Sequence, residues 1–311
     1  MKKLNLLFAI PLFILSMSSC EKEEAKNNKN LNIITDTYIS DKDGNKLLEL
    51  NNSYYKSIAG ALDSKDDFKK KLHALLEQSH KNRLSYTPGC WDALKKADED
   101  PNNSNNIICF YSNVSIPKND KDGSSSANVV WNREHLYPQS KGFKNNEAIA
   151  HNDIHHLRVT EKKINAKRGS DDFNDTQLQS LCGKEIADSI KGDIARAMLY
   201  MSVRYDADDY TSYEYNGATY TDSDDLDLEL TSSKGDNKKP YTGSYYLGDL
   251  YYLIKWNYED PVSDAERKRN EIVYSIQGNR NPFIDYNDFV AYLYPEYAKD
   301  YIDISNLDYL L

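Results

Sequence analysis

The feature that most constrains the fold is a short stretch near the middle of the chain that carries most of its histidines. Its residue pattern predicts a strand over 128–131 that closes by His135, a second strand over 157–160, and a helix over 161–168. Gly169 follows that helix, and glycine is typical of the position just after a helix end. Two strands and a helix this close in sequence can bring side chains from three elements to one place.

Two neighbouring side chains end the first predicted strand. Glu134 and His135 would face opposite sides of a regular strand, so both can serve one site only if the strand ends or bends there. Pro138 favours an early end because proline cannot donate to a strand ladder. On the predicted helix, Asn165 and Arg168 are three residues apart and therefore share a face.

These four side chains make up the set that phosphodiester hydrolysis needs. Glu134 and the amide oxygen of Asn165 are hard donors suited to Mg²⁺, and a metal ion can polarise a phosphate. A neutral His135 can take a proton from an attacking water, since histidine titrates near neutral pH. Arg168 can offset the negative charge of the transition state.

Net charge separates this stretch from the rest of the chain. The whole chain has 39 Lys and Arg against 49 Asp and Glu, a formal charge of −10, which is the wrong sign for binding phosphates. Residues 131–170 hold eight Lys and Arg against four acids, a local charge of +4. A solvated charged face would give the same count, so the charge supports a nucleic-acid surface only together with the site residues.

Outside this stretch the chain reads as one α+β domain. Apolar residues at helical spacing predict further helices over 66–81, from near Gly192, over 247–254 and from about Ser263. The polar stretch 206–243 is expected to be a solvated loop.

The sequence resembles the bacterial endonuclease I family of secreted nucleases in three ordered segments. They read Asn-Arg-Glu-His at 132–135, Ala-His-Asn-Asp-Ile-His-His-Leu-Arg at 150–158 and Asn-Ala-Lys-Arg-Gly-Ser at 165–170. Further matches extend the resemblance over about residues 85–290. It implies a ββα-metal, or His-Me, finger embedded in a mostly helical single domain of the α+β class.

Carried over by position, the resemblance implies His135 as general base, and Glu134 with Asn165 as ligands of Mg²⁺, or of Mn²⁺ or Ca²⁺ in its place. Arg168 falls on the family's arginine after the metal asparagine. Some members hold phosphate with an arginine on a long, disulfide-containing loop, but here residues 136–149 contain neither Arg nor Cys. We therefore expect Arg158 to take the phosphate-binding role.

The second histidine cluster has two interpretations. We expect Asp153 and His155 to buttress the site. His151 and His155 stand four residues apart, a spacing that would also suit zinc. No cysteine lies nearby and no glutamate completes a zinc-protease pattern, so we favour the buttressing role.

The N-terminus reads as an export signal over residues 1–20. Lys2 and Lys3 precede an apolar run over 4–17, and small residues then lead to Cys20, as in a bacterial lipoprotein signal whose cysteine is lipidated. We expect a flexible polar tether over 21–52 and the catalytic domain over 53–311. These features predict an outer-membrane or cell-surface lipoprotein held to the membrane by its lipid; the alternative is an ordinary cleaved signal and a secreted or periplasmic product.

Cysteine usage follows from export, because disulfides persist in oxidising compartments. If Cys20 carries lipid, Cys90, Cys109 and Cys182 remain, and three thiols allow at most one intramolecular bridge. We expect Cys90–Cys109 because its loop is short, although spacing alone does not fix the pairing.

Two functions remain open at the level of sequence. The first is an exported endonuclease that cuts DNA, RNA or both without sequence preference, since no base-reading module is visible. The second is a catalytically silent surface lipoprotein that binds nucleic acid or another ligand on the same fold. Intact Glu134, His135 and Asn165 favour activity. The sequence indicates nucleic acid as the partner, and we infer no protein partner from it.

Overall fold

The computed structural model describes residues 37–40, 46–49, 52–58, 64–123, 130–143, 148–206, 213–215, 218–220, 227–231 and 244–302. The chain divides into two units, 1–35 and 36–311, and every described residue belongs to the second. The expected signal peptide, Cys20 and most of the expected tether therefore lie outside the described residues.

Helices are the main secondary structure of the described chain, and their ends carry clear signals. The side chain of Ser64 accepts a hydrogen bond at the start of the first helix. Ser263 and Glu266 form a reciprocal capping box at the start of the longest C-terminal helix. The helices are α1 (Lys65–Ser79), α2 (Gly89–Ala97), α3 (Lys162–Arg168), α4 (Asp175–Cys182), α5 (Lys184–Arg204), α6 (Leu250–Glu259), α7 (Asp264–Gln277), α8 (Pro282–Asp285), α9 (Phe289–Leu293) and α10 (Pro295–Ala298). Three short 3₁₀ turns are η1 (Ser53–Tyr55), η2 (Gln139–Lys141) and η3 (Ala150–Asn152).

The strands of the described chain pair in twos rather than in one large sheet. The antiparallel pairs are β1 (Thr37–Ser40) with β2 (Lys46–Glu49), β3 (Asn106–Ile108) with β4 (Ser115–Pro117), β5 (Trp131–His135) with β6 (Leu157–Glu161), and β7 (Tyr213–Tyr215) with β8 (Ala218–Tyr220). β9 (Asp227–Thr231) and β10 (Ser244–Gly248) are parallel. Helices and small sheets together give a mixed α+β fold, as the sequence predicts.

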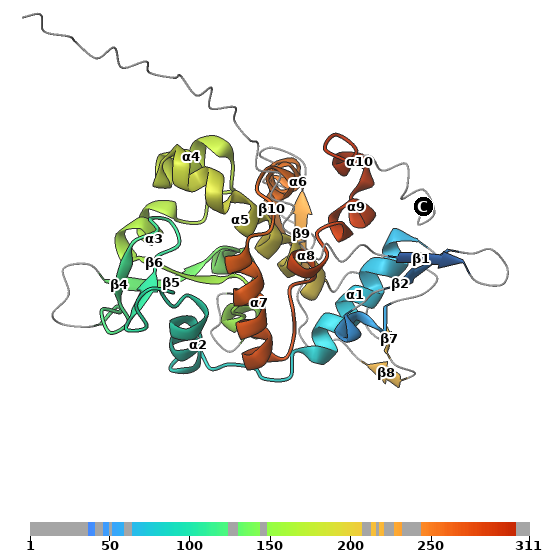
Figure 1. Cartoon of the computed structure of the whole chain (residues 1–311), viewed down its shortest axis with the longest axis horizontal. Coiled ribbons are helices and arrows are strands. Elements are labelled where there is room, and N and C mark those ends of the chain that lie inside the picture. The colour runs from blue at the N-terminus through green and yellow to red at the C-terminus, as the bar shows by residue number, and fades with distance from the viewer. Residues whose placement is uncertain are drawn as a thin grey trace, which may run out of the picture. The chain divides into compact units, whose positions relative to one another are not determined.

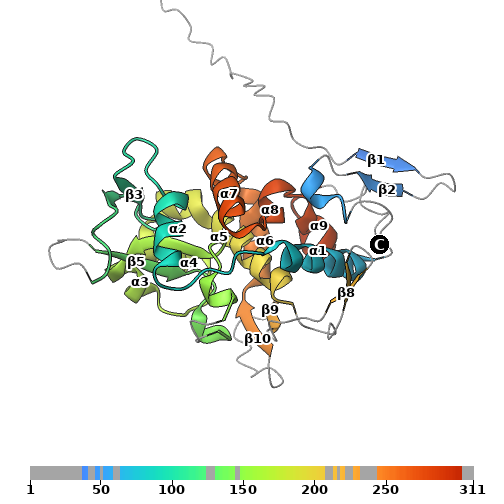
Figure 2. The same ribbon diagram turned by 90° about the horizontal axis from the view of Figure 1, so that it is seen from below.

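The elements that position the candidate site lie along one side of α5, where Arg158 faces Asp193 and Asp153 accepts from Tyr200 and Tyr205. In Figures 1 and 2, α2, α3 and the β5–β6 ribbon lie together, α1 and α9 lie toward the opposite end, and α5 runs between them. An apolar cluster that includes Trp91, Trp131, Leu157, Val159 and Val273 joins α2, the β5–β6 ribbon and α7. This cluster anchors one side of the ribbon and leaves its end to carry polar side chains.

Three elements differ from the sequence-based expectation. α5 begins at Lys184, well before the start expected near Gly192. Leu247 fits the helical spacing of 247–254, but it lies in β10 opposite Leu230, and α6 starts only after Asp249 caps it through the amide of Tyr251. The stretch 206–243 includes three short strands and is therefore not only a loop. β10, the parallel partner of β9, follows it only after an intervening segment. The pattern of residues within β9 therefore does not predict this pairing.

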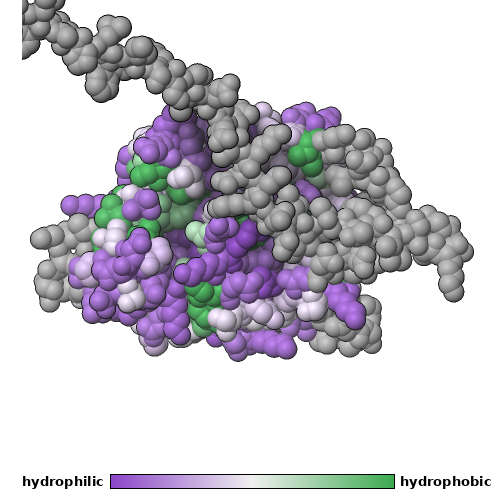
Figure 3. Space-filling view, viewed as in Figure 1, coloured by the Kyte–Doolittle hydropathy of each residue, from purple (hydrophilic) through white to green (hydrophobic). Residues whose placement is uncertain are grey.

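The surface is mainly polar. The face shown in Figure 3 is largely hydrophilic, with apolar residues in small separate areas. Large exposed apolar side chains in the described ranges are Val114, Tyr251 and Tyr274. Of the helices that the structure describes, none combines the length and the apolar character that a membrane span requires.

Candidate active site

The candidate site is built on the β5–β6 ribbon and on α3, which follows β6 directly. Across the ribbon Glu134 pairs with Arg158 and His135 with Leu157. α3 ends at Gly169, whose φ of 64° lies in the region that favours glycine. The predicted succession of two strands and a short helix is confirmed, although the first strand begins at Trp131.

One face of β5, here called the histidine face, carries Trp131, Arg133 and His135. The ring of Trp131 packs 4.8 Å from that of Trp91. The guanidinium of Arg133 lies 3.3 Å from the ring centre of Tyr86 and 4.1 Å from that of Trp91. His135 continues the row, with its ring 6.0 Å from that of Tyr86. Aromatic side chains thus line the approach to the histidine.

The other face of β5, here called the glutamate face, carries Asn132 and Glu134. Asn132 accepts a hydrogen bond from Asn165 of α3, and Glu134 contacts Arg168 at the end of the same helix. Glu134 and His135 therefore face opposite ways, as a regular strand requires. β5 ends at His135, so both side chains lie at the end of the ribbon.

His135 is held as a neutral imidazole of known tautomer. Its Nε2 lies 3.0 Å from the carbonyl oxygen of His151. A carbonyl only accepts, so Nε2 carries the proton and Nδ1 keeps its lone pair. Nδ1 has no hydrogen bond within the described ranges, and the residue is 6 % exposed. Burial, with the nearby His156 and His151, holds the pKa of His135 well below its ordinary value.

Glu134 is a buried carboxylate, and the partners found for it among the described residues all contact one oxygen, Oε1. It is 2 % exposed, and its Oε1 accepts from the hydroxyl of Tyr111 at 2.8 Å and lies 3.4 Å from Nε of Arg168. Its Oε2 has no partner in the part of the chain that the structure describes. Burial raises the pKa of Glu134 to about 7, although Arg168 and Tyr111 act in the opposite direction.

Asn165 presents an oxygen in the same way. Its Nδ2 donates to Oδ1 of Asn132 at 2.9 Å and to the carbonyl of Arg133 at 3.1 Å. Because that carbonyl only accepts, the atom facing β5 is the amide nitrogen. Both N–H groups are committed, and Oδ1 is left without a partner among the described residues.

Arg168 holds the end of the ribbon in place. It is 1 % exposed and lies 4.4 Å over the ring of Phe173. Its Nη2 donates to the carbonyl of Leu136 at 2.8 Å, and its Nε faces Glu134. It therefore contacts the residues on both sides of His135. Such a buried guanidinium is placed to position the site rather than to meet a substrate.

Arg158 is directed away from the histidine. It is 4 % exposed, and its guanidinium lies 4.0 Å from Asp98 and 3.8 Å from Asp193. Burial lowers its pKa to about 10, with Arg269 acting in the same direction. The structure thus brings Glu134, Asn165 and Arg168 together but gives Arg158 different partners.

Asp153 and His155 lie behind the site in a buried polar network. Asp153 is fully buried and accepts hydrogen bonds from Tyr200 at 2.6 Å, Tyr205 at 2.9 Å and Gln277 at 3.0 Å. Nε2 of His155 lies 3.1 Å from the carbonyl of Asn279, and burial lowers the pKa of His155 to about 4. The network ties the loop before β6 to α5 and α7.

The described residues do not contain a cluster of three or more His, Cys, Asp or Glu placed to hold a metal ion. His151 lies between the amide oxygens of Asn152 and Gln139, both at 3.0 Å, whereas His155 faces Asn279. The spacing that suggested zinc therefore does not bring the two rings to a common ion.

Of the described residues, Cys90, Cys109 and Cys182 are separate thiols, so the Cys90–Cys109 bridge expected from spacing is not formed in the structure. Both are buried in one apolar cluster but have different polar neighbours. The thiol of Cys90 donates to the carbonyl of Asn152, while Cys109 lies beside Glu161. A short loop in sequence did not imply that the two sulfur atoms face each other.

Sequence reasoning missed Tyr111, which supplies the shortest hydrogen bond to Glu134. It follows β3, outside the strand–strand–helix stretch, and a single tyrosine among 25 gives no local signal. It also missed Tyr86, whose ring lies 4.3 Å from that of His151.

Comparisons with known proteins show which family the chain resembles. The chain matches the family model described as Endonuclease I over residues 64–185 and 182–288, which contain every site residue named above. It is 38 % identical over 253 residues to an "Extracellular ribonuclease" of Bacillus subtilis (strain 168), covering 78 % of each chain. It is 38 % identical over 247 residues to an "Extracellular ribonuclease" of Bacillus amyloliquefaciens, covering 76 % of each.

Proposed function

The chain belongs to the endonuclease I family and is a nuclease that hydrolyses phosphodiester bonds, and from this premise we propose how it works and on what. It is an exported endonuclease without sequence preference that uses His135 as general base and one divalent cation, Mg²⁺, held by Glu134 and Asn165. β5, β6 and α3 form its ββα-metal, or His-Me, finger.

The observation that carries this proposal is the hydrogen bond from His135 to the carbonyl of His151. It fixes the ring and leaves Nδ1 as an acceptor at the end of the ribbon. The depressed pKa of His135 keeps that acceptor unprotonated at neutral pH. An in-line water hydrogen-bonded to Nδ1 can give up its proton as it attacks phosphorus, and the imidazole becomes imidazolium.

The donor set on the glutamate face fits a hard divalent cation. Oε2 of Glu134 and Oδ1 of Asn165 are oxygens without partners among the described residues. A carboxylate and an amide oxygen suit Mg²⁺, which keeps waters in its other positions; Mn²⁺ and Ca²⁺ accept the same donors. When bound, the cation would polarise the phosphate and stabilise the leaving oxygen.

Arg168 acts in this proposal as a positioning residue. Its contacts with Glu134 and with the carbonyl of Leu136 fix both neighbours of His135. Asp153 and His155 serve further back, where they hold the loop that supplies the carbonyl of His151. Arg158 is not part of the reacting group, because its guanidinium faces Asp98 and Asp193.

RNA is the first substrate to test, with DNA as the second. Both relatives carry the name extracellular ribonuclease. The exposed side of α3 carries Lys162, Lys163 and Lys167. Lys162 pairs with Asp122 at 2.8 Å, so Lys163 and Lys167 are the cations that can offer positive charge to a phosphate backbone next to the site. Export, and attachment through a lipid on Cys20, complete the proposal from the N-terminal sequence.

The test is cleavage by purified protein of single-stranded RNA and of plasmid DNA, with Mg²⁺ and with EDTA. The proposal predicts cleavage that stops in EDTA, returns with added Mg²⁺ and is lost in His135→Ala. Cleavage that continues in EDTA would contradict the metal-dependent mechanism. Binding of nucleic acid without cleavage under any of Mg²⁺, Mn²⁺ or Ca²⁺ would instead support a silent binding protein.

A further inference from the structure

A row of alternating cations and aromatic rings follows β5 toward His135 and has no role in the proposed reaction. This row, here called the cation row, consists of Lys121, Trp91, Arg133 and Tyr86. Nζ of Lys121 lies 4.9 Å from the ring centre of Trp91. The guanidinium of Arg133 lies 4.1 Å from the same ring and 3.3 Å from that of Tyr86. The ring of Tyr86 in turn lies 6.0 Å from that of His135, so the row leads to the proposed base.

Arg133 presents one edge of its guanidinium. Its hydrogen bonds, to the carbonyl of Tyr86 and to the hydroxyl of Thr87, both start from Nη1. The side chain is half-buried, and its Nε and Nη2 are not among the buried, unpartnered atoms of the described residues. The bonds from Nη1 and the contact with two rings fix the plane of the guanidinium. The edge formed by Nε and Nη2 is therefore held ready for a phosphate, which a guanidinium binds in its own plane.

The positive charge of the cation row is not cancelled by an ion pair. Neither Arg133 nor Lys121 lies within ion-pair distance of a carboxylate among the described residues. Asp122, the acid that follows Lys121 in sequence, is engaged by Lys162 at 2.8 Å. Two such cations on one side of a strand offer the local positive charge that a phosphate backbone requires, even on a chain of negative net charge.

The spacing along β5 relates the cation row to the reacting phosphate. Arg133 and His135 are alternate residues, so their side chains project from the same face, about 7 Å apart. This is about the length of one nucleotide in an extended strand. When His135 meets the water that attacks one phosphate, Arg133 lies where the neighbouring phosphate arrives. Lys121 forms a β-bridge with Trp131, the next residue of this face, and lies one step further along.

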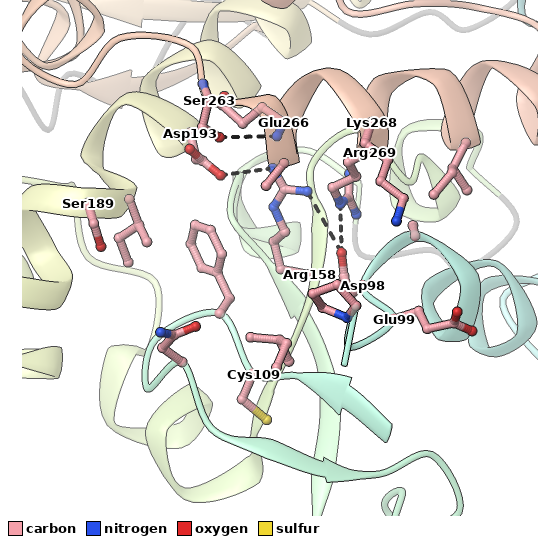
Figure 4. A pocket seen from close by; sticks show the side chains of 18 of the residues that line it. Asp98, Glu99, Cys109, Arg158, Ser189, Asp193, Ser263, Glu266, Lys268 and Arg269 are labelled. Atoms are coloured by element: carbon pink, nitrogen blue, oxygen red, sulfur yellow. Dashed lines mark hydrogen bonds and ion pairs between the residues drawn. The ribbon is translucent and has the colours of Figure 1, made fainter. Parts of the chain in front are cut away.

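The other arginine of the ribbon has a different environment. Figure 4 shows the guanidinium of Arg158 facing Asp98 and Asp193 in a cavity between α2, α5 and α7. Its Nε and Nη1 are buried, and acidic side chains outnumber basic ones among the residues that line this cavity. A phosphate would meet no excess of positive charge there. Of the two arginines of the ribbon, Arg133 is therefore the one that can reach a substrate.

We propose that Arg133 binds the phosphate next to the reacting one and that Lys121 binds the phosphate beyond it, an inference that rests on the proposed nuclease function. The substrate strand then runs along the histidine face of β5, over the cation row. All of these contacts are made to the sugar–phosphate backbone, which is the same for every base. The strand path therefore agrees with cleavage without sequence preference.

The first test is binding of a short oligouridylate RNA to His135→Ala, which should bind RNA without cutting it. Fluorescence anisotropy at several salt concentrations gives the slope of log affinity against log salt. Adding Arg133→Met should weaken binding on the order of tenfold and reduce the slope by about 0.7, the contribution of one phosphate of a single strand. Lys121→Met should reduce the slope by a similar amount. Arg267→Met, at a half-buried arginine whose guanidinium donates to the carbonyl of Ile284, should change neither quantity.

A conservative variant separates binding of phosphate from packing of the row. Arg133→Lys keeps the charge and loses the planar contact with the rings, so it should retain most of the salt slope. Lys121→Met decides the question if Arg133→Met does not fold, because Lys121 contacts a single ring at the end of the row. An equal loss of slope in Arg133→Lys and Arg133→Met would assign Arg133 to packing and overturn the proposal. An unchanged slope in Lys121→Met, or a loss of slope in Arg267→Met, would overturn it as well.

The second test is the kinetics of RNA cleavage in the chain that keeps His135. Arg133→Met should raise KM on the order of tenfold and change kcat by less than about threefold, because a contact with a neighbouring phosphate is the same in the ground state and the transition state. A fall in kcat at unchanged KM would place Arg133 at the reacting phosphate and overturn the proposal.

The two tests also distinguish this inference from the nuclease function itself. A salt slope that depends on Arg133 in a chain that cuts no RNA would keep the strand path and remove the nuclease. Cleavage of RNA with a slope that does not depend on Arg133 would remove the strand path and leave the nuclease.

Discussion

The histidine face and the glutamate face of the β5–β6 ribbon come from alternate residues of one strand, yet they hold their polar groups differently. His135 is fixed by a main-chain carbonyl, which brings no net charge to the ring. Glu134 is fixed by a buried guanidinium and a phenol, which favour a carboxylate. A carboxylate on the histidine face would raise the pKa of His135 and protonate the base. Strand alternation therefore separates a neutral base from a charged ligand by a single residue.

The largest expected effect is loss of the base. His135→Ala should lower kcat by roughly 10²–10⁴-fold, the range usual for a general base. The measurement is initial cleavage rate at saturating Mg²⁺. Added imidazole should restore part of the rate by entering the space of the missing ring. A variant within threefold of wild type would place the base elsewhere, because the whole effect assigned to proton transfer would be missing.

The second largest effect is expected from loss of the Arg168 guanidinium, which pairs with Glu134 on the glutamate face. Arg168→Met leaves the carboxylate of Glu134 buried beside an apolar side chain, which should lower the free energy of unfolding by about 3–5 kcal/mol. Urea denaturation measures this, and Lys163→Met, on an exposed position of α3, is the matched control. An equal free energy of unfolding for the two variants would show that Arg168 does not stabilise the buried carboxylate of Glu134.

Low pH should lower the free energy of unfolding through His156, whose ring lies 5.4 Å from that of His135. His156 is fully buried, and burial lowers its pKa to about 4. The unfolded chain takes up this proton near pH 6.5 and the folded chain only near pH 4, so stability falls as the pH drops through that window. The loss attributable to this group is about 3 kcal/mol at pH 4 and below. His156→Asn should flatten the decline in unfolding free energy between pH 7 and 4. Parallel curves for the two proteins would disprove the assignment.

The smallest expected effect concerns the amide ligand. Asn165→Ala should raise the Mg²⁺ concentration for half-maximal cleavage on the order of tenfold or more. Asn165→Asp keeps an oxygen donor and should lose less, although it gives up both hydrogen bonds to β5. Asn105→Ala, at an exposed turn, is the control. If Asn165→Ala and Asn105→Ala respond alike to Mg²⁺, Asn165 is not a ligand.

The sequence predicted the ribbon and its helix well because their signals are local. Short apolar runs, the cap at Gly169 and the spacing of Asn165 and Arg168 all act within a few residues. The same logic predicted that Glu134 and His135 would face opposite ways. What makes the site polar and ordered is not local, however. Tyr111 reaches Glu134 from another strand pair.

Long-range contacts also explain why Arg158 and Leu247 have surroundings that differ from those expected from the sequence. Arg158 looked available for phosphate because the loop after His135 has no arginine, but Asp98 and Asp193, both remote in sequence, flank its guanidinium. Leu247 matched a helical period, but its strand partner Leu230 determined its conformation. A sequence pattern predicts which side chains share one face of a helix or strand far better than it predicts which residues pack against that face.

The separation of base and ligand is tested most directly by calorimetric titration of Mn²⁺ into the full chain and two variants. The account predicts that His135→Ala binds Mn²⁺ as the wild type does yet does not cleave RNA. It predicts that Glu134→Gln binds Mn²⁺ on the order of tenfold or more weakly. Mn²⁺ binding that is lost in His135→Ala, or retained in full by Glu134→Gln, would contradict the division of labour between the two faces.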